Sequence, residues 1–270
     1  MRTLAVTNQK GGSGKTTTAV NLAAALGEAG RRVLVVDLDP QASASAWLGV
    51  KDGGRGLLEV FTDNGNVSDL VHETDAAGVD LVPSSAWLAN VEKALAGEVG
   101  AELVLRETMA ELPADRWDFV LVDCPPALGL LTVSALCAVR EVLVPVEASA
   151  MAMAGLASLL KTVERVRDRL NPELAVAAVL VCRVDSRTNL SRDVVDHLRQ
   201  RFGELVMDAV VRETVRLREA WSFAQPVTTY DPRGHGAEDY RAVAAELLDE
   251  KAEPPLVEVK PQPLNVKARS

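Results

Sequence analysis

Residues 8–17 of this 270-residue chain read NQKGGSGKTT, and they directly follow the short apolar run at 4–6. The segment 16–29 that comes next has the apolar spacing of a helix. The stretch therefore predicts a strand, a glycine-rich loop and a helix in succession, which is the context in which a loop wraps around phosphate groups.

The residue types in this loop suit Mg-ATP. Glycines let backbone N–H groups turn inward around phosphates, and the start of the helix adds partial positive charge. Lys15 can reach the outer phosphates, and the Thr16 hydroxyl can ligate Mg²⁺. The predicted nucleotide-binding residues of the loop are Lys10, Gly11, Gly12, Ser13, Gly14, Lys15, Thr16 and Thr17.

Short, Val-rich apolar runs alternate broadly with segments of helical spacing along the chain. Continuous runs of this kind are typical of strands buried on both faces of a sheet. The expected strands are 4–6, 33–36, 79–82, 119–122, 142–146 and 175–181, and the expected helices are 16–29, 86–95, 103–112, 155–170 and 189–202. The alternation predicts an α/β fold with a doubly wound, mainly parallel sheet flanked by helices, the P-loop NTPase fold.

The prolines up to position 232 stand at the ends of these runs, so we expect one continuous ATPase domain over residues 1–252. Residues 253–270 read EPPLVEVKPQPLNVKARS, with four prolines and no helical period. We expect this segment to be a mobile tail outside the fold.

Composition narrows the class of protein further. Three widely spaced cysteines with no C-x-x-C pair suggest neither disulfides nor a zinc or iron–sulfur site, and no apolar stretch is long enough for a membrane span. A cytoplasmic location is expected. The net charge is −9, yet residues 161–218 hold twelve Arg or Lys against nine Asp or Glu, a local charge of +3.

Carboxylates follow two more of the predicted strands. Asp37 and Asp39 come after 33–36 in the run DLDPQ, and Asp123 ends the strand 119–122, as in a Walker B segment. Ligands of open α/β sheets bind at the carboxyl ends of strands, where Asp123 would hold the Mg²⁺ shell. Asp37 and Asp39, two residues apart, should share a side of the chain, although such a pair alone is equally consistent with a turn or a helix cap.

Four motifs in this order resemble one family. The loop KGGSGKTT has Gln9 where the ordinary Walker A pattern has glycine, and resembles the deviant Walker A loop of the MinD/ParA ATPases. DLDPQ resembles the first ParA switch, DCPPALGLLT at 123–132 the second, and VPVE at 144–147 the segment after the next strand. The bulkier residues usual in ParA proteins are absent at 148–153.

The chain is thus identified as similar to ParA/Soj-type partition ATPases. This resemblance implies an ATP-dependent homodimer in which Lys10 reaches the partner's nucleotide. It also implies that Asp39 orients or deprotonates the attacking water next to the metal, with slow hydrolysis stimulated by a ParB-type centromere-binding protein. Sequence-independent binding to double-stranded DNA, and hence a place on the nucleoid, is expected as well.

The resemblance extends to the second half of the chain. It places Arg183 and Asp185 near the adenine base, and it implies DNA contacts by Arg187, Arg212, Arg216 and Arg218. A solvated, ion-paired helix surface is the alternative for each arginine, because Glu213 and Glu219 interleave with them.

Other functions within the group remain open to comparison. A membrane-associated MinD-type ATPase needs a C-terminal amphipathic helix, which the four prolines of the tail oppose. A reductase or cluster scaffold needs paired cysteines. A ParA-like ATPase that positions a protein cargo would share the whole site. Site-specific repression is not expected, since no helix-turn-helix segment precedes Arg2.

Overall fold

A computed structural model describes residues 1–63, 65–149 and 151–249 of the chain. The predicted tail at 253–270 lies outside the described residues. Within the described part, no helix combines the length and the apolar character needed to cross a bilayer.

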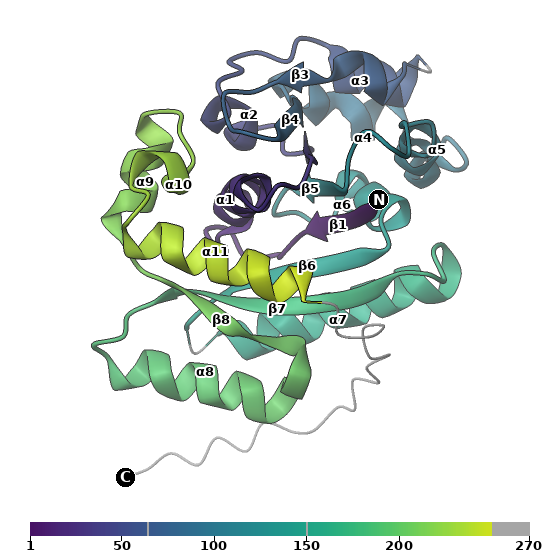
Figure 1. Cartoon of the computed structure of the whole chain (residues 1–270). Coiled ribbons are helices and arrows are strands. Elements are labelled where there is room, and N and C mark those ends of the chain that lie inside the picture. The colour runs from purple at the N-terminus through teal and green to yellow at the C-terminus, as the bar shows by residue number, and fades with distance from the viewer. Residues whose placement is uncertain (64, 150, 250–270) are drawn as a thin grey trace.

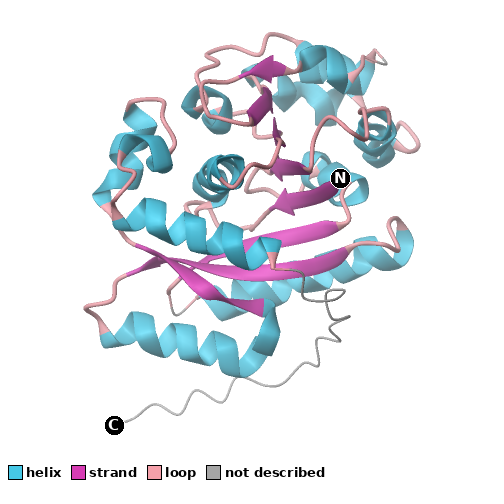
Figure 2. Ribbon diagram, in the orientation of Figure 1, coloured by secondary structure: helices cyan, strands magenta, loops and turns pink. Residues whose placement is uncertain are grey.

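One eight-stranded sheet runs through the described part in the order β3-β4-β2-β5-β1-β6-β7-β8 (Figures 1 and 2). All neighbouring strands are parallel except β3 and β4. The strands are β1 (Arg2–Val6), β2 (Val33–Asp37), β3 (His72–Glu73), β4 (Val79–Val82), β5 (Phe119–Asp123), β6 (Glu141–Glu147), β7 (Ala175–Val184) and β8 (Val206–Arg212). The prediction of a mainly parallel α/β sheet is confirmed.

Helices cover both faces of this sheet. In Figure 1, α11 crosses in front of the strands and α7 lies behind them. The α-helices are α1 (Lys15–Glu28), α2 (Ser43–Trp47), α3 (Gly56–Thr62), α4 (Val91–Ala94), α5 (Val104–Ala110), α6 (Leu130–Ala138), α7 (Ala152–Arg169), α8 (Asn189–Phe202), α9 (Val215–Ser222), α10 (Val227–Tyr230) and α11 (His235–Leu248). Short 3₁₀ turns are η1 (Val67–Leu70), η2 (Ala86–Asn90), η3 (Ala101–Leu103) and η4 (Gly203–Leu205).

Alternate residues of the buried strands contribute to two apolar cores, one on each face of the sheet. Leu4 and Val6 pack against the helices α1 and α11 on one face, whereas Ala5 belongs to the core beneath α3 to α8. Every residue of β2 and β5 is buried. Their continuous apolar sequence follows from this double burial, since both sides of each strand leave water.

The register of the central strands brings the predicted motifs together. β1 lies between β5 and β6, and Val6 pairs with Asp123 across the β1–β5 ladder. Asp37 pairs with Asp123 across the β2–β5 ladder. The glycine-rich loop after β1 and the carboxylates that end β2 and β5 therefore share one edge of the sheet.

Two expectations about individual elements need correction. Residues 86–95 form the turn η2 followed by the single-turn helix α4, not one continuous helix. The Asn90 side chain donates to the Trp87 carbonyl at 3.1 Å, a local bond that competes with helical pairing. The structure also contains β3 and β8, which were not predicted as strands.

Candidate functional site

The glycine-rich loop is shaped to receive an anion. Gly12 and Gly14 adopt left-handed backbone angles, with φ of 74° and 94°, which glycine tolerates best. A Cβ added at Gly11 or Gly12 would meet no atom within 4 Å, so there is open space beside the loop. No side chain caps the start of α1 at Gly14, which leaves the first N–H groups of the helix as donors for a phosphate.

Lys15 stands at the first position of α1 and is 7% exposed. Burial lowers the pKa of Lys15, and the nearby Asp123, Cys124 and Asp39 oppose this shift. Its Nζ donates to the Lys10 carbonyl at 3.4 Å, a long bond. An ammonium has three donors, so Lys15 keeps the capacity to bind phosphate oxygens.

Asp37 and Asp39 are separated by their surroundings. Asp37 ends β2 and is fully buried, and it accepts bonds from the backbone N–H of Ser45 at 2.8 Å and from its hydroxyl at 2.7 Å. Asp39 instead lines the nucleotide-sized cavity described below. The strand, and with it the regular alternation of side chains, ends at Asp37, and the two carboxylates differ in burial. Asp37 therefore anchors α2, and Asp39 is the acid available to a ligand.

Asp123 fits a Mg²⁺ site. Its two carboxylate oxygens are buried and have no hydrogen-bond partner of regular geometry among the described residues. Burial and the neighbouring Asp37 raise the pKa of Asp123 well above its ordinary value, and the nearby Thr16 hydroxyl opposes this shift. A cation beside the carboxylate would offset this cost. Across residues 1–63, 65–149 and 151–249, no three His, Cys, Asp or Glu side chains form a metal cluster. The oxygens of Asp123, Thr16 and a nucleotide phosphate are of the kind that Mg²⁺ prefers.

A cavity of about 470 Å³ extends from the glycine-rich loop to α9 and α11. This volume falls within the roughly 300–1,000 Å³ of small-molecule sites. The lining residues are Gly11, Gly12, Gly14, Lys15, Thr16, Thr17, Asp39, Pro126, Cys182, Arg183, Val211, Arg212, Glu213, Thr214, Leu217, Arg218 and Tyr240. The cavity thus joins the predicted phosphate loop to the predicted base side, but Asp185 is not among its lining residues.

Lys10 lies outside this lining, on a chain of charged contacts. Its Nζ forms an ion pair with Glu147, and the Ser149 hydroxyl is 3.3 Å away. Glu147 also pairs with Arg183 at 3.1 Å, and Arg183 pairs with Glu213 at 3.5 Å. The Lys10 bond lowers the pKa of Glu147. Within its own chain, Lys10 is held by Glu147.

Arg183 has an unusual backbone. It is a non-glycine residue with φ of 55°, at an irregularity in the β7–β8 ladder between Cys182 and Val184. Such left-handed angles cost about 1–3 kcal/mol and concentrate at functional sites. Arg183 also lines the cavity.

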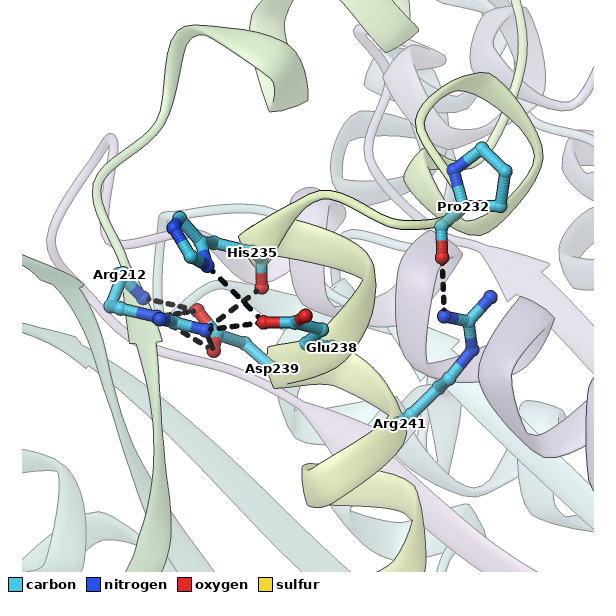
Figure 3. Close-up of polar contacts among 6 residues, drawn as sticks. All are labelled: Arg212, Pro232, His235, Glu238, Asp239 and Arg241. Atoms are coloured by element: carbon cyan, nitrogen blue, oxygen red, sulfur yellow. Dashed lines mark hydrogen bonds and ion pairs between the residues drawn. The ribbon is translucent and has the colours of Figure 1, made fainter.

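Three of the four arginines predicted to contact DNA are paired within the chain. Arg187 bonds Asp185 at 2.9 Å, which turns Asp185 toward the arginine, and Arg216 bonds Glu219 at 2.7 Å. Figure 3 shows Arg212 beside two acids of α11, and its guanidinium bonds Asp239 at 2.5 Å and Glu238 at 3.2 Å. Arg218 is exposed and lines the cavity.

Several cavity residues lacked a signal in the sequence. Cys182 and Tyr240 form part of the far wall, where the Thr18 hydroxyl of α1 lies 3.3 Å from the Tyr240 hydroxyl. Thr214 lines the cavity and also accepts the Arg216 N–H that begins α9. These residues come from β7, from the N-cap of α9 and from α11, far from the loop in sequence, so no local motif marks them.

Known proteins resemble this chain over nearly all of its length. Residues 1–176 match a family described as AAA domain. An uncharacterised protein of Mycobacterium tuberculosis is 44% identical over 92% of this chain and 79% of its own. The sporulation initiation inhibitor protein Soj of Bacillus subtilis is 40% identical over 90% of this chain and 97% of its own. The Caulobacter vibrioides chromosome partitioning protein ParA is 40% identical over 92% of this chain and 94% of its own.

Solved structures share the fold. The structure of cobyrinic acid a,c-diamide synthase from Mycobacterium smegmatis with bound ATP analogue and magnesium superposes on this chain with a TM-score of 0.80. It is 36% identical to this chain and covers 91% of it, and the match spans 93% of the other protein.

Proposed function

The chain belongs to the Soj/ParA family of chromosome-partitioning ATPases, and from this premise we propose that it is a Mg-ATP-dependent dimerising switch that segregates DNA. One observation carries the proposal. A single cavity brings the glycine-rich phosphate loop together with Asp39, and the buried carboxylate of Asp123 lies near both Lys15 and Asp39. The magnesium and ATP analogue in the M. smegmatis neighbour support the choice of ligand.

The roles of the site residues follow from their positions. The N–H groups of the loop and Lys15 would hold the phosphates, and Thr16 and Asp123 would hold Mg²⁺. When bound, Mg²⁺ neutralises charge on the phosphates. Asp39 would orient the attacking water, because it lines the cavity together with the phosphate loop, whereas Glu213, the other lining acid, pairs with Arg183 at 3.5 Å. Arg183 would lie along the base.

Lys10 would act across the dimer. Its ammonium does not line its own cavity, so its proposed target is the nucleotide of the partner subunit. Lys10→Ala should therefore still bind ATP, because Lys15 remains in place. We expect it to stay monomeric with ATP in light scattering. A normal ATP dimer would refute this role.

We further propose that the ATP dimer binds duplex DNA without sequence preference on the nucleoid, and that a ParB-type protein stimulates its slow turnover. Contacts from arginine to phosphate position a protein on DNA without reading bases, which suits an ATPase that must bind DNA of any sequence.

For the domain organisation, we propose one ATPase domain over residues 1–252 and a separate tail over residues 253–270.

The diamide synthase name of the structural neighbour points to amide transfer. Taking nitrogen from glutamine needs a reactive thiolate. Cys124, Cys137 and Cys182 are all buried, and burial raises the pKa of Cys137 to about 11 and of Cys182 to about 12. These thiols are unsuited to that chemistry, and we therefore favour partition.

Asp39→Ala tests the catalytic proposal. We expect the variant to bind ATP with near-normal affinity, because the loop and Lys15 are intact, and to lose phosphate release by 10²-fold or more, on the order expected for a positioned catalytic group. Asp75→Ala, which removes an exposed acid far from the cavity, is the matched control. Phosphate release by the Asp39 variant at the rate of the control would overturn the role.

A further inference from the structure

The outer face of α7 carries a row of evenly spaced cations. Lys161, Arg165 and Arg169 are all exposed and follow one another at intervals of four residues. Residues four apart lie on the same face of a helix, about 6 Å apart along the axis. The three side chains, named here the α7 row, therefore span about 12 Å in line.

The α7 row has no counter-ions within the described residues. None of its three members forms an ion pair or a side-chain hydrogen bond there. The acids on the same helix, Glu164 and Asp168, both pair with Arg167. Like charges one turn apart repel one another, so the row weakens the isolated helix slightly and favours an external anion.

The α7 row differs from three of the four arginines that the family resemblance singles out; the fourth, Arg218, is exposed and also has no ion pair among the described residues. Arg187, Arg212 and Arg216 already have carboxylate partners in the chain. Binding a phosphate would require each of them to give up an existing bond or share it. The α7 row offers three charges at no such cost.

We propose that the α7 row binds the phosphate backbone of duplex DNA. The inference rests on the proposed function, since it names a surface by which a partition ATPase would bind DNA. One DNA strand presents a charge about every 3.4 Å along the axis, so a 12 Å row covers three to four phosphates. The remaining exposed residues of the first turns of α7, Ala154 and Ser158, are small, and the exposed Met151 at the N-cap lies ten residues, or about 15 Å, before Lys161. A helix that inserts into lipid needs bulky apolar residues at its interface, so a membrane surface is disfavoured.

The test is a triple variant, Lys161→Ala with Arg165→Ala and Arg169→Ala. Its control removes three exposed cations that also lack ion pairs among the described residues, by Arg31→Ala, Lys51→Ala and Lys93→Ala. Both variants lower the net charge equally, so a difference between them reports on location. Equal thermal midpoints verify that both variants fold. Binding to a random-sequence duplex is measured with ATP between about 50 and 200 mM salt, where phosphate contacts dominate affinity.

Three lost phosphate contacts should reduce the slope of log affinity against log salt by about 2.7, and affinity on the order of 10²-fold near 0.1 M salt. Wild-type binding by the triple variant overturns the inference alone. Failure of the wild-type protein to bind DNA overturns both the inference and the proposed function. Row-dependent binding to phosphatidylglycerol vesicles without DNA binding would assign the surface to lipid and also overturn it.

Discussion

Arg212→Ala should destabilise the protein because it leaves the buried carboxylate of Asp239 without its positively charged partner. The Arg212 Nε donates to both oxygens of Asp239, at 2.9 and 3.0 Å, and Asp239 is 6% exposed. After substitution, the carboxylate keeps the Arg212 backbone N–H at 2.8 Å but loses its guanidinium (Figure 3). Arg212 would then matter for the fold whether or not it also contacts DNA.

The size of the loss follows from burial. Removing one partner of a fully buried ion pair costs about 3–5 kcal/mol. The Arg212 side chain is 33% exposed, so water screens part of the interaction. We therefore expect the free energy of unfolding to fall by about 2–3 kcal/mol, or the midpoint by roughly 5–10 °C for a domain of this size.

Urea denaturation of three variants measures this loss. Arg218→Ala, which removes an exposed arginine without an ion pair in the described part of the chain, should stay within about 0.5 kcal/mol of wild type. Combining Arg212→Ala with Asp239→Asn removes the stranded charge and should recover about 1 kcal/mol or more. An Arg212→Ala protein as stable as Arg218→Ala contradicts the reasoning.

Two further substitutions probe the scaffold. Gly27→Ala would gain about 1 kcal/mol from helix propensity, but its Cβ would lie 2.0 Å from the Ala77 carbonyl oxygen, so we expect a net loss in urea melts. A Cβ added at Gly155 in α7 meets no atom within 4 Å, so Gly155→Ala should raise the free energy of unfolding. If both substitutions changed the free energy of unfolding in the same direction, this reasoning would be wrong. Burial raises the pKa of Asp37 to about 6, so between about pH 4 and 6 the folded chain retains a proton that the unfolded chain releases, and this group's contribution to stability falls as pH rises. Asp37→Asn should thus become more stable relative to wild type from pH 4 to 6. A difference in the free energy of unfolding that stays constant over this range would show that the raised pKa of Asp37 is not the cause.

The sequence predicted those strands well that are buried on both faces of the sheet. Strands such as β2 and β5 are buried on both faces, and their unbroken apolar runs identify them. β8 is an edge strand with an exposed Asp208, and so lacks such a run. An isolated carboxylate in a short alternating segment resembles a loop as much as a strand.

The same distinction holds for the candidate site. The phosphate loop is contiguous, so its residues could be predicted together. Those at one end of the cavity are Gly11, Gly12, Gly14, Lys15, Thr16 and Thr17, whereas Lys10 lies outside the lining. The difference between Asp37 and Asp39 depends on Ser45, eight residues away, which no local pattern ties to either acid. The far wall at Cys182 and Tyr240 arises only when β7 and α11 pack against α1.

The central position of β1 also bears on how the chain is made. Its neighbours in the sheet are β5 and β6, and a ribosome adding about 5–20 residues per second needs on the order of 10 s to reach β5 after β1. During that time an apolar strand and the glycine-rich loop remain unpaired on the nascent chain. Tyr240 is the last residue in sequence that lines the cavity. A ligand that contacts the whole cavity could therefore stabilise only a nearly completed chain.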